Sequence, residues 1–226
     1  MATIVKGCCS KLFLDFFKHQ VTKSTKWNFN YPMGKPFEDK HAKIDVIQGD
    51  TMHDKFLGGV SMSLLMMIHE TAKKQNVNVP LDLLFCGISM KDEHREDNVH
   101  TDHQKDELQD TPIIKVLGIL NSDWKKSYGG GFEHGGVLHS PEPGDFIIFD
   151  PRVPHRAQDI LTDKKRIAID WTLKNDRLDV LVPIDGTLPY EVVTEGGSSG
   201  RTTDLEGLES QSDTGTPVTA EEAAAN

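Results

Sequence analysis

The sequence predicts a mostly β domain with flanking helices, and two observations support this fold class. After residue 98, short apolar runs rich in Ile, Val and Phe alternate with clusters of Gly, Pro, Asp and Ser. Before residue 98, the longer apolar runs contain more Leu and Met, which favour helices. Several short strands at roughly even spacing are typical of an antiparallel sandwich or barrel.

Four segments precede the β-rich part. Residues 11–19 (KLFLDFFKH) are apolar and predict a helix or a buried segment. Residues 57–74 are the best helix candidate, because unbranched Leu and Met dominate and the run ends in two lysines. Residues 79–89 (VPLDLLFCGIS) predict a strand, and the charged run at residues 91–98 predicts a solvated turn or loop.

Three β-rich runs follow residue 98, and clusters of turn-forming residues separate them. The predicted strands are residues 113–120 (IIKVLGIL), 146–149 (FIIF) and 166–173 (RIAIDWTL). The turn clusters are residues 128–136, 140–145 and 162–165.

The chain of 226 residues has the length of one domain with an added tail. Residues 196–226 contain six acids, one base and no aromatic residue, and Gly, Ser and Thr are frequent. Such a segment buries too little apolar surface to offset the entropy that ordering removes. We therefore expect one domain over residues 1–190 and an acidic, disordered tail over residues 191–226.

Composition argues against several classes of protein. The net charge of −10 provides no broad basic field, so nucleic acid is an unfavoured partner. The apolar run at residues 64–68 is far shorter than the roughly 20 residues of a membrane helix, so we expect no membrane partner. The three cysteines form no CxxC pair, which indicates a reducing, cytoplasmic setting without a disulfide framework.

Two H-x-D/E triplets stand among the ten histidines: His94 with Glu96, and His100 with Asp102. In a strand, residues i and i+2 point to the same face, so such a triplet can place an imidazole and a carboxylate on one ion. We favour His100 and Asp102, because a predicted strand follows them, whereas the other pair lies in a charged run. A second histidine would leave three positions on the ion open, the pattern of non-haem Fe(II) oxygenases. His155, after a predicted strand and a proline-fixed bend, is the candidate.

Arg166, eleven residues after His155, is the candidate for binding an anion. A hairpin through residues 162–165 would bring the strand that begins at Arg166 back beside the one carrying His155. A guanidinium deep in a barrel needs an anionic partner, and it binds carboxylates with two hydrogen bonds. The alternative is a surface arginine in the basic turn of residues 164–166.

These residues belong to an ordered series of motifs. In chain order the motifs are His100-x-Asp102, LGILN (117–121), GGGF (129–132), PEPGDFIIFD (141–150), PHRA (154–157) and RIAIDW (166–171). Over residues 98–174 the sequence resembles the 2-oxoglutarate- and Fe(II)-dependent dioxygenases, in particular the prolyl-4-hydroxylase-like group.

The resemblance implies a double-stranded β-helix, a jelly-roll or cupin-like barrel in which two sheets face each other. The core motifs of this barrel would lie at residues 98–174. Residues 1–97 would supply helices and strands that buttress it.

The resemblance also implies a set of site residues. Iron would be held by His100, Asp102 and His155. The C5 carboxylate of 2-oxoglutarate would be held by Arg166, with Lys165 as the alternative because some relatives use lysine. O2 would be the second co-substrate, and ascorbate an optional cofactor.

The activity implied is hydroxylation of an unactivated C–H bond, with succinate and CO2 as co-products. Asp102 favours this reaction, because halogenases of the superfamily replace that carboxylate with a small residue. The group suggests a prolyl or other amino-acid side chain in a peptide or protein as substrate. Two alternatives stay open: the same chemistry on a small metabolite or nucleobase, and a non-catalytic metal-binding β-barrel module.

A structural zinc site is a further alternative for the histidines. His103 with His100, or His134 with His139, has spacing that zinc sites use. No cysteine lies near them, and the spacing assembles no tetrahedral set of ligands. The sequence therefore favours the iron site over zinc.

Overall fold

The computed structural model describes residues 2–29, 41–92, 97–102 and 112–175. The chain divides into two compact units, Met1–Pro189 and Tyr190–Asn226, and all described residues lie in the first. The predicted acidic tail lies outside the described residues, so its disorder stays a prediction. Among the helices of the described ranges, none combines the length and the apolar character needed to cross a membrane.

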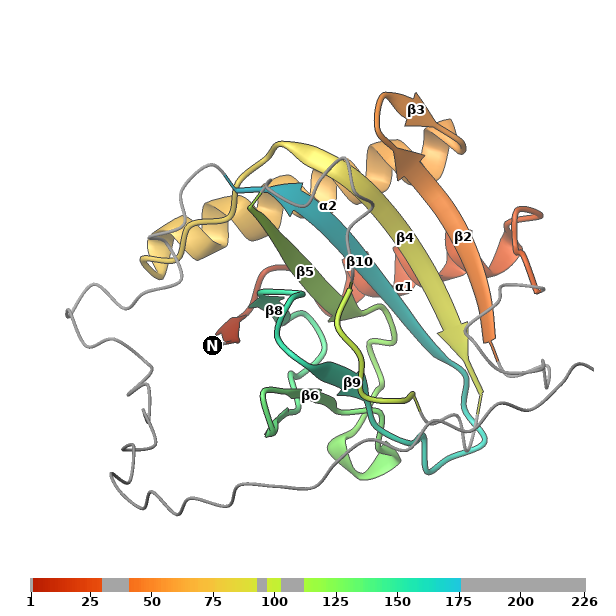
Figure 1. The fold of residues 1–226 in the computed structure, drawn as a ribbon. Coiled ribbons are helices and arrows are strands. Elements are labelled where there is room, and N and C mark those ends of the chain that lie inside the picture. Colours follow the sequence, from red (N-terminus) through yellow and green to blue (C-terminus); the bar gives the residue numbers. More distant parts are fainter. Residues whose placement is uncertain (1, 30–40, 93–96, 103–111, 176–226) are drawn as a thin grey trace, which may run out of the picture. The chain divides into compact units, whose positions relative to one another are not determined.

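The largest element of the described fold is an antiparallel sheet (Figure 1). Within the described residues it has seven strands in the order β1-β8-β5-β10-β4-β2-β3. Their bounds are Thr3–Val5 for β1, His41–Gln48 for β2, Thr51–Met52 for β3, Leu83–Lys91 for β4, Ile113–Ile119 for β5, Phe146–Phe149 for β8 and Arg166–Lys174 for β10. The strands β5, β8 and β10 are those predicted from the β-rich runs after residue 98, and they lie side by side in the sheet.

A smaller sheet of three described strands lies against one face of the large sheet (Figure 1). Its order is β7-β6-β9, with bounds Val137–His139, Phe132–His134 and His155–Ala157. Phe132 of β6 packs against Phe149 of β8, with ring centroids 4.6 Å apart. The predicted fold class, mostly β with flanking helices, is confirmed, although the two sheets are not closed into a barrel.

The predicted hairpin between β9 and β10 is wrong. Strand β9 pairs with β6 in the small sheet, whereas β10 pairs with β4 and β5 in the large one. The segment that connects β9 to β10 forms no tight turn. It is hydrogen-bonded instead to residues 128–131 (YGGG). Gln158 N–H donates to the carbonyl of Gly131, and Leu161 N–H donates to the carbonyl of Tyr128. The chain therefore passes from one sheet to the other between His155 and Arg166.

Two helices cover the other face of the large sheet (Figure 1). They are α1 (Lys11–Lys23) and α2 (Lys55–Lys74), and a short 3₁₀ turn, η2, spans Lys126–Tyr128. The side chains of Ser10 and Asp54 cap the two helices, each accepting a hydrogen bond from the backbone N–H three residues on. The helix predicted at residues 57–74 is confirmed, and residues 11–19, predicted as a helix or a buried segment, are helical.

Alternation along β10 gives the large sheet two different faces. Its odd-numbered residues, from Ile167 to Leu173, are buried in the core that the sheet shares with the helices. The even-numbered residues Arg166, Ala168 and Asp170 point to the opposite face and line a pocket. A strand that reads as apolar therefore presents two charged side chains on one face.

The strand predicted at residues 79–89 is displaced along the chain. The observed strand β4 begins at Leu83, after Pro80, which lacks the N–H that a sheet ladder needs. It continues to Lys91, in a region predicted to be a solvated loop. Lys91 is buried there because its ammonium forms an ion pair with the buried carboxylate of Asp97.

Close packing between β5 and β8 requires a glycine at position 118. Gly118 is the register partner of Phe146, and a Cβ at this position would lie 2.2 Å from Cε1 of that ring. We expect Gly118→Ala to lower the free energy of unfolding by about 1–3 kcal/mol, because buried groups must shift to admit the methyl group. Urea denaturation followed by circular dichroism measures this change.

The matched control is Gly59→Ala, at an exposed position of α2. No atom lies within 4 Å of the Cβ it would add. This variant is expected to raise the free energy of unfolding by about 0.5–1 kcal/mol, because alanine is the better helix former. Equal effects of the two variants would contradict the close packing of Gly118 against Phe146.

Candidate active site

Two segments that are far apart in the sequence meet at the site. His100 N–H donates to the carbonyl of His155 (3.0 Å), and His155 N–H donates to the carbonyl of His100 (2.8 Å). Next to this pair, Asp102 N–H donates to the carbonyl of Pro151 (2.9 Å). The H-x-D triplet thus lies on a short bridge to β9 instead of a regular strand, and backbone hydrogen bonds fix its place beside His155.

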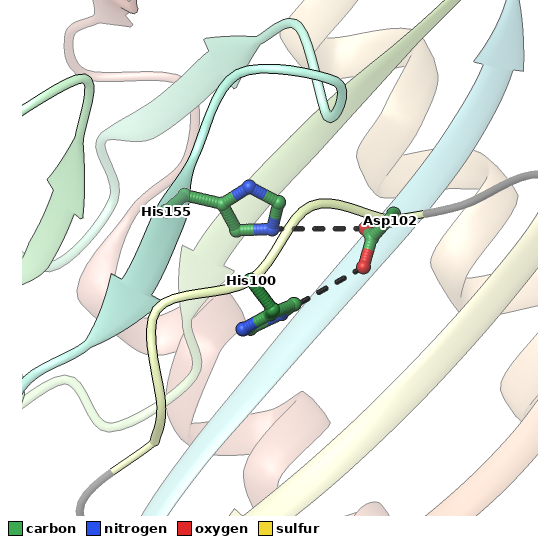
Figure 2. Close-up of side chains that lie close together, drawn as sticks. All are labelled: His100, Asp102 and His155. Atoms are coloured by element: carbon green, nitrogen blue, oxygen red, sulfur yellow. Dashed lines mark ion pairs between the residues drawn. The ribbon is translucent and has the colours of Figure 1, made fainter. Parts of the chain in front are cut away.

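The side chains of His100, Asp102 and His155 point toward one another (Figure 2). One ligand atom from each residue lies within 4.8 Å of the other two. Oδ1 of Asp102 lies 3.7 Å from Nε2 of His100, and Oδ2 lies 3.7 Å from Nε2 of His155. The structure therefore brings together the three residues that the sequence predicted as metal ligands.

Backbone carbonyls fix the tautomers of both imidazoles. Nδ1 of His100 lies 2.8 Å from the carbonyl of Asn98, and Nδ1 of His155 lies 2.8 Å from the carbonyl of Val153. A carbonyl oxygen only accepts, so each Nδ1 carries a proton, and Nε2 of each ring faces Asp102. This is the orientation in which histidine binds a metal ion, with its other nitrogen donating to an oxygen.

The environment also favours the protonation states that metal binding needs. Burial alone would raise the pKa of Asp102, but the charge and hydrogen bond of Lys115 outweigh it and hold the pKa below its usual value. Burial lowers the pKa of His155, against the opposing effect of its hydrogen bond to the carbonyl of Val153. At neutral pH the site therefore contains an ionised carboxylate beside a neutral imidazole.

The three side chains open onto a pocket. Strands of the large sheet line most of it, and β6 and β9 of the small sheet contribute Phe132, His155 and Ala157. The charged side chains in its lining are Lys43, Lys91, Asp97, Asp102, Lys115, Arg166 and Asp170. Most charged groups of the lining form ion pairs with one another, whereas Arg166 retains an unused donor, as described next.

Arg166, the first residue of β10, lies in this pocket with 4% of its surface exposed. No described residue accepts a hydrogen bond from its Nε. Burial lowers the pKa of Arg166 to about 10, and the negative charge of Asp97 acts in the opposite direction. The guanidinium therefore stays charged at neutral pH. A buried guanidinium with an unused donor suits the binding of a carboxylate.

Two neighbours hold Arg166 in place. The side-chain amide of Asn121 donates to the carbonyl of Lys165 (3.0 Å) and accepts from the N–H of Ile167 (2.7 Å), so it binds the backbone on both sides of the arginine. Gly130 lies beside the arginine side chain, where a Cβ would lie 2.9 Å from Cδ of Arg166. One residue of the GGGF motif and one of the LGILN motif therefore help to fix the position of Arg166.

Lys165, the alternative anion-binding residue, lies outside the pocket. Its side chain is 58% exposed, and its Nζ lies 3.7 Å from Oδ1 of Asp92. Arg166 lines the pocket, whereas Lys165, which precedes β10, does not. The geometry favours Arg166.

Sequence reasoning missed Lys115 and Asp170. Nζ of Lys115 lies 2.6 Å from Oδ2 of Asp102 and 3.6 Å from Oδ2 of Asp170. Each interrupts an apolar strand, Lys115 in IIKVLGI and Asp170 in RIAIDWTLK. A charged residue inside an apolar strand is the sequence signal that could have revealed both, since a charge in a central strand needs a partner.

Of the competing histidines, the structure describes His134 and His139, and neither belongs to the set of potential ligands at this site. His94, Glu96 and His103 lie outside the described residues. Nε2 of His134 lies 3.1 Å from the carbonyl of Asp150, and His139 is the register partner of Phe132. Among the described residues, the three potential metal ligands that lie close together are His100, Asp102 and His155.

No family model and no curated protein matches the sequence. Solved structures match in fold. A prolyl-4-hydroxylase from Pseudomonas putida aligns with a TM-score of 0.50 and 16% identity, over 77% of this chain and 92% of that one. HygX from Streptomyces hygroscopicus, with nickel and 2-oxoglutarate bound, aligns with a TM-score of 0.55 and 14% identity, over 76% and 81%.

A third match is a prolyl hydroxylase from Trichoplax adhaerens, in complex with a peptide of the hypoxia inducible factor oxygen degradation domain. It aligns with a TM-score of 0.53 and 15% identity, over 76% of this chain and 83% of that one. At these identities the likeness is one of fold. The resemblance read from the motifs is therefore confirmed at the level of the fold that these oxygenases share.

Proposed function

We propose that this chain is a 2-oxoglutarate- and Fe(II)-dependent dioxygenase that hydroxylates an unactivated C–H bond. One observation carries the proposal: the triad of His100, Asp102 and His155 lines the same pocket as the buried guanidinium of Arg166. A metal site with open positions beside an unsatisfied anion-binding group is what a chelating keto acid needs.

The chain's own residues have distinct tasks under this proposal. The two Nε2 atoms and the carboxylate of Asp102 would hold Fe(II) on one face. Arg166 would bind the distal carboxylate of 2-oxoglutarate and orient the molecule toward the metal. When bound, the iron and the keto acid supply the oxidising chemistry, with O2 consumed and succinate and CO2 released.

The first substrate class we propose is a prolyl or other amino-acid side chain in a peptide or protein. Three of the matched structures are prolyl hydroxylases, and one of them contains a peptide. A small-molecule substrate is the second candidate, because HygX, a match of similar quality, has also been solved with hygromycin B bound. We propose a cytoplasmic setting, in keeping with three free cysteines, of which Cys8 and Cys86 are buried.

An anaerobic titration of the metal-free protein with Fe(II) and 2-oxoglutarate tests the proposal. We expect the weak visible charge-transfer absorption of an iron-chelated keto acid, and succinate release once O2 is admitted. Iron binding without this absorption would contradict the oxygenase function and favour a metal-binding module. Hydroxylation of members of a panel of proline-containing peptides and small molecules would then separate the two substrate classes.

A further inference from the structure

Lys115 and Asp170 form a charged pair beside the triad, and the proposed function assigns neither a role. Lys115 is on β5 and Asp170 on β10, adjacent strands at the centre of the large sheet. Nζ of Lys115 lies between two carboxylates, 2.6 Å from Oδ2 of Asp102 and 3.6 Å from Oδ2 of Asp170. Its charge is therefore balanced, and it is not a second anion-binding group beside Arg166.

The contact singles out one of the two carboxylate oxygens of Asp102. Each oxygen lies 3.7 Å from a histidine Nε2, Oδ1 from that of His100 and Oδ2 from that of His155, but the ammonium contacts Oδ2 alone. A carboxylate binds a metal ion through one oxygen or through both. An oxygen in close ion-pair contact with an ammonium is a poorer metal ligand, because the ammonium and the ion compete for it.

We propose that Lys115, held in turn by Asp170, is a positioning residue that occupies one oxygen of Asp102 and limits this carboxylate to one-oxygen metal binding. The inference rests on the proposed function, because a keto acid that takes two positions and O2 that takes one need three open positions. Two histidine nitrogens and one carboxylate oxygen leave three positions on a six-coordinate ion, whereas a two-oxygen carboxylate leaves two.

Mn(II) is the probe for this inference, and the readout is the relaxation of water protons, which counts exchangeable waters on the bound ion. The wild-type protein is expected to hold Mn(II) with three waters. Lys115→Met, which keeps the length of the side chain and removes the charge, is expected to hold it with two. The relaxivity of the bound ion should then fall by about one third.

Affinity separates positioning from a loss of structure. The ammonium of Lys115 repels the metal ion, so Lys115→Met is expected to bind Mn(II) at least as tightly as the wild type. Lys115→Arg retains a cation and is expected to keep the wild-type relaxivity. Asp170→Asn keeps the shape of its side chain but weakens the hold on Lys115. The relaxivity of Mn(II) bound to this variant is expected to lie between those of the wild type and Lys115→Met.

Two results would overturn the positioning role alone: a relaxivity of Lys115→Met equal to that of the wild type, or a wild-type protein that holds Mn(II) with two waters. The second result is measured on the wild-type protein, so it does not depend on whether a variant folds. A wild-type protein that binds no Mn(II) would overturn the proposed function as well, so the two failures are distinguishable.

Discussion

His155→Ala is expected to abolish Fe(II)-dependent turnover. His155 supplies one of the two Nε2 atoms of the triad, its backbone pairs with His100, and its side chain is 5% exposed. Residues that only orient a metal ligand change affinity or activity by about 10–100-fold when mutated, so loss of a ligand should exceed about 100-fold. Succinate release and Fe(II) affinity, measured on the same preparation, check the prediction.

The matched control is His139→Ala, on β7 of the same small sheet. His139 does not line the pocket, and its variant is expected to keep wild-type turnover and Fe(II) affinity. Full activity in His155→Ala would remove this residue from the ligand set. Loss of activity in both variants would point to damage of the small sheet instead of loss of a ligand.

Arg166→Ala is expected to raise the concentration of 2-oxoglutarate needed for half-maximal turnover by about 30-fold or more. Truncation of one partner of a buried, hydrogen-bonded charge pair costs about 2–5 kcal/mol. Fe(II) affinity should change little, because Arg166 is not among the triad residues. A titration of 2-oxoglutarate at saturating Fe(II) measures the first quantity, and a titration of Fe(II) the second.

Two further measurements make this prediction specific. The ligand-free variant should be no less stable than the wild type, because the removed guanidinium has an Nε without a partner among the described residues. The rise in melting temperature that 2-oxoglutarate gives the wild type should disappear. Lys165→Ala, whose side chain is exposed, is the control, and the same rise in 2-oxoglutarate requirement in that variant would move the assignment by one residue.

Strong local patterns made much of the fold predictable. The helices α1 and α2 follow from apolar runs, and β8 was predicted with its observed bounds because FIIF is bounded by turn residues. The short strands β6, β7 and β9 have three residues each, too few to show an alternating pattern. Pairing between β9 and β6 depends on contacts distant in sequence, which spacing along the chain does not report.

The residues that meet at the candidate site were predictable, whereas their surroundings were less so. His100, Asp102, His155 and Arg166 belong to motifs with a fixed order, and the motif order led to all four. Lys115 escaped notice because its strand reads as apolar, and its importance depends on a neighbour, Asp170, that is 55 residues away in the chain. Pairs of buried charges become visible only when the strand order is known.

The bridge between His100 and His155 also links the site to folding. It joins segments 55 residues apart, so this contact has a high contact order. The unfolded chain has no preformed site, and an ion that binds only the native state stabilises it by mass action, by about 2.7 kcal/mol at 100 times its dissociation constant. Under the proposed function, iron supply would therefore influence how much of this protein is folded, in addition to how much of it is active.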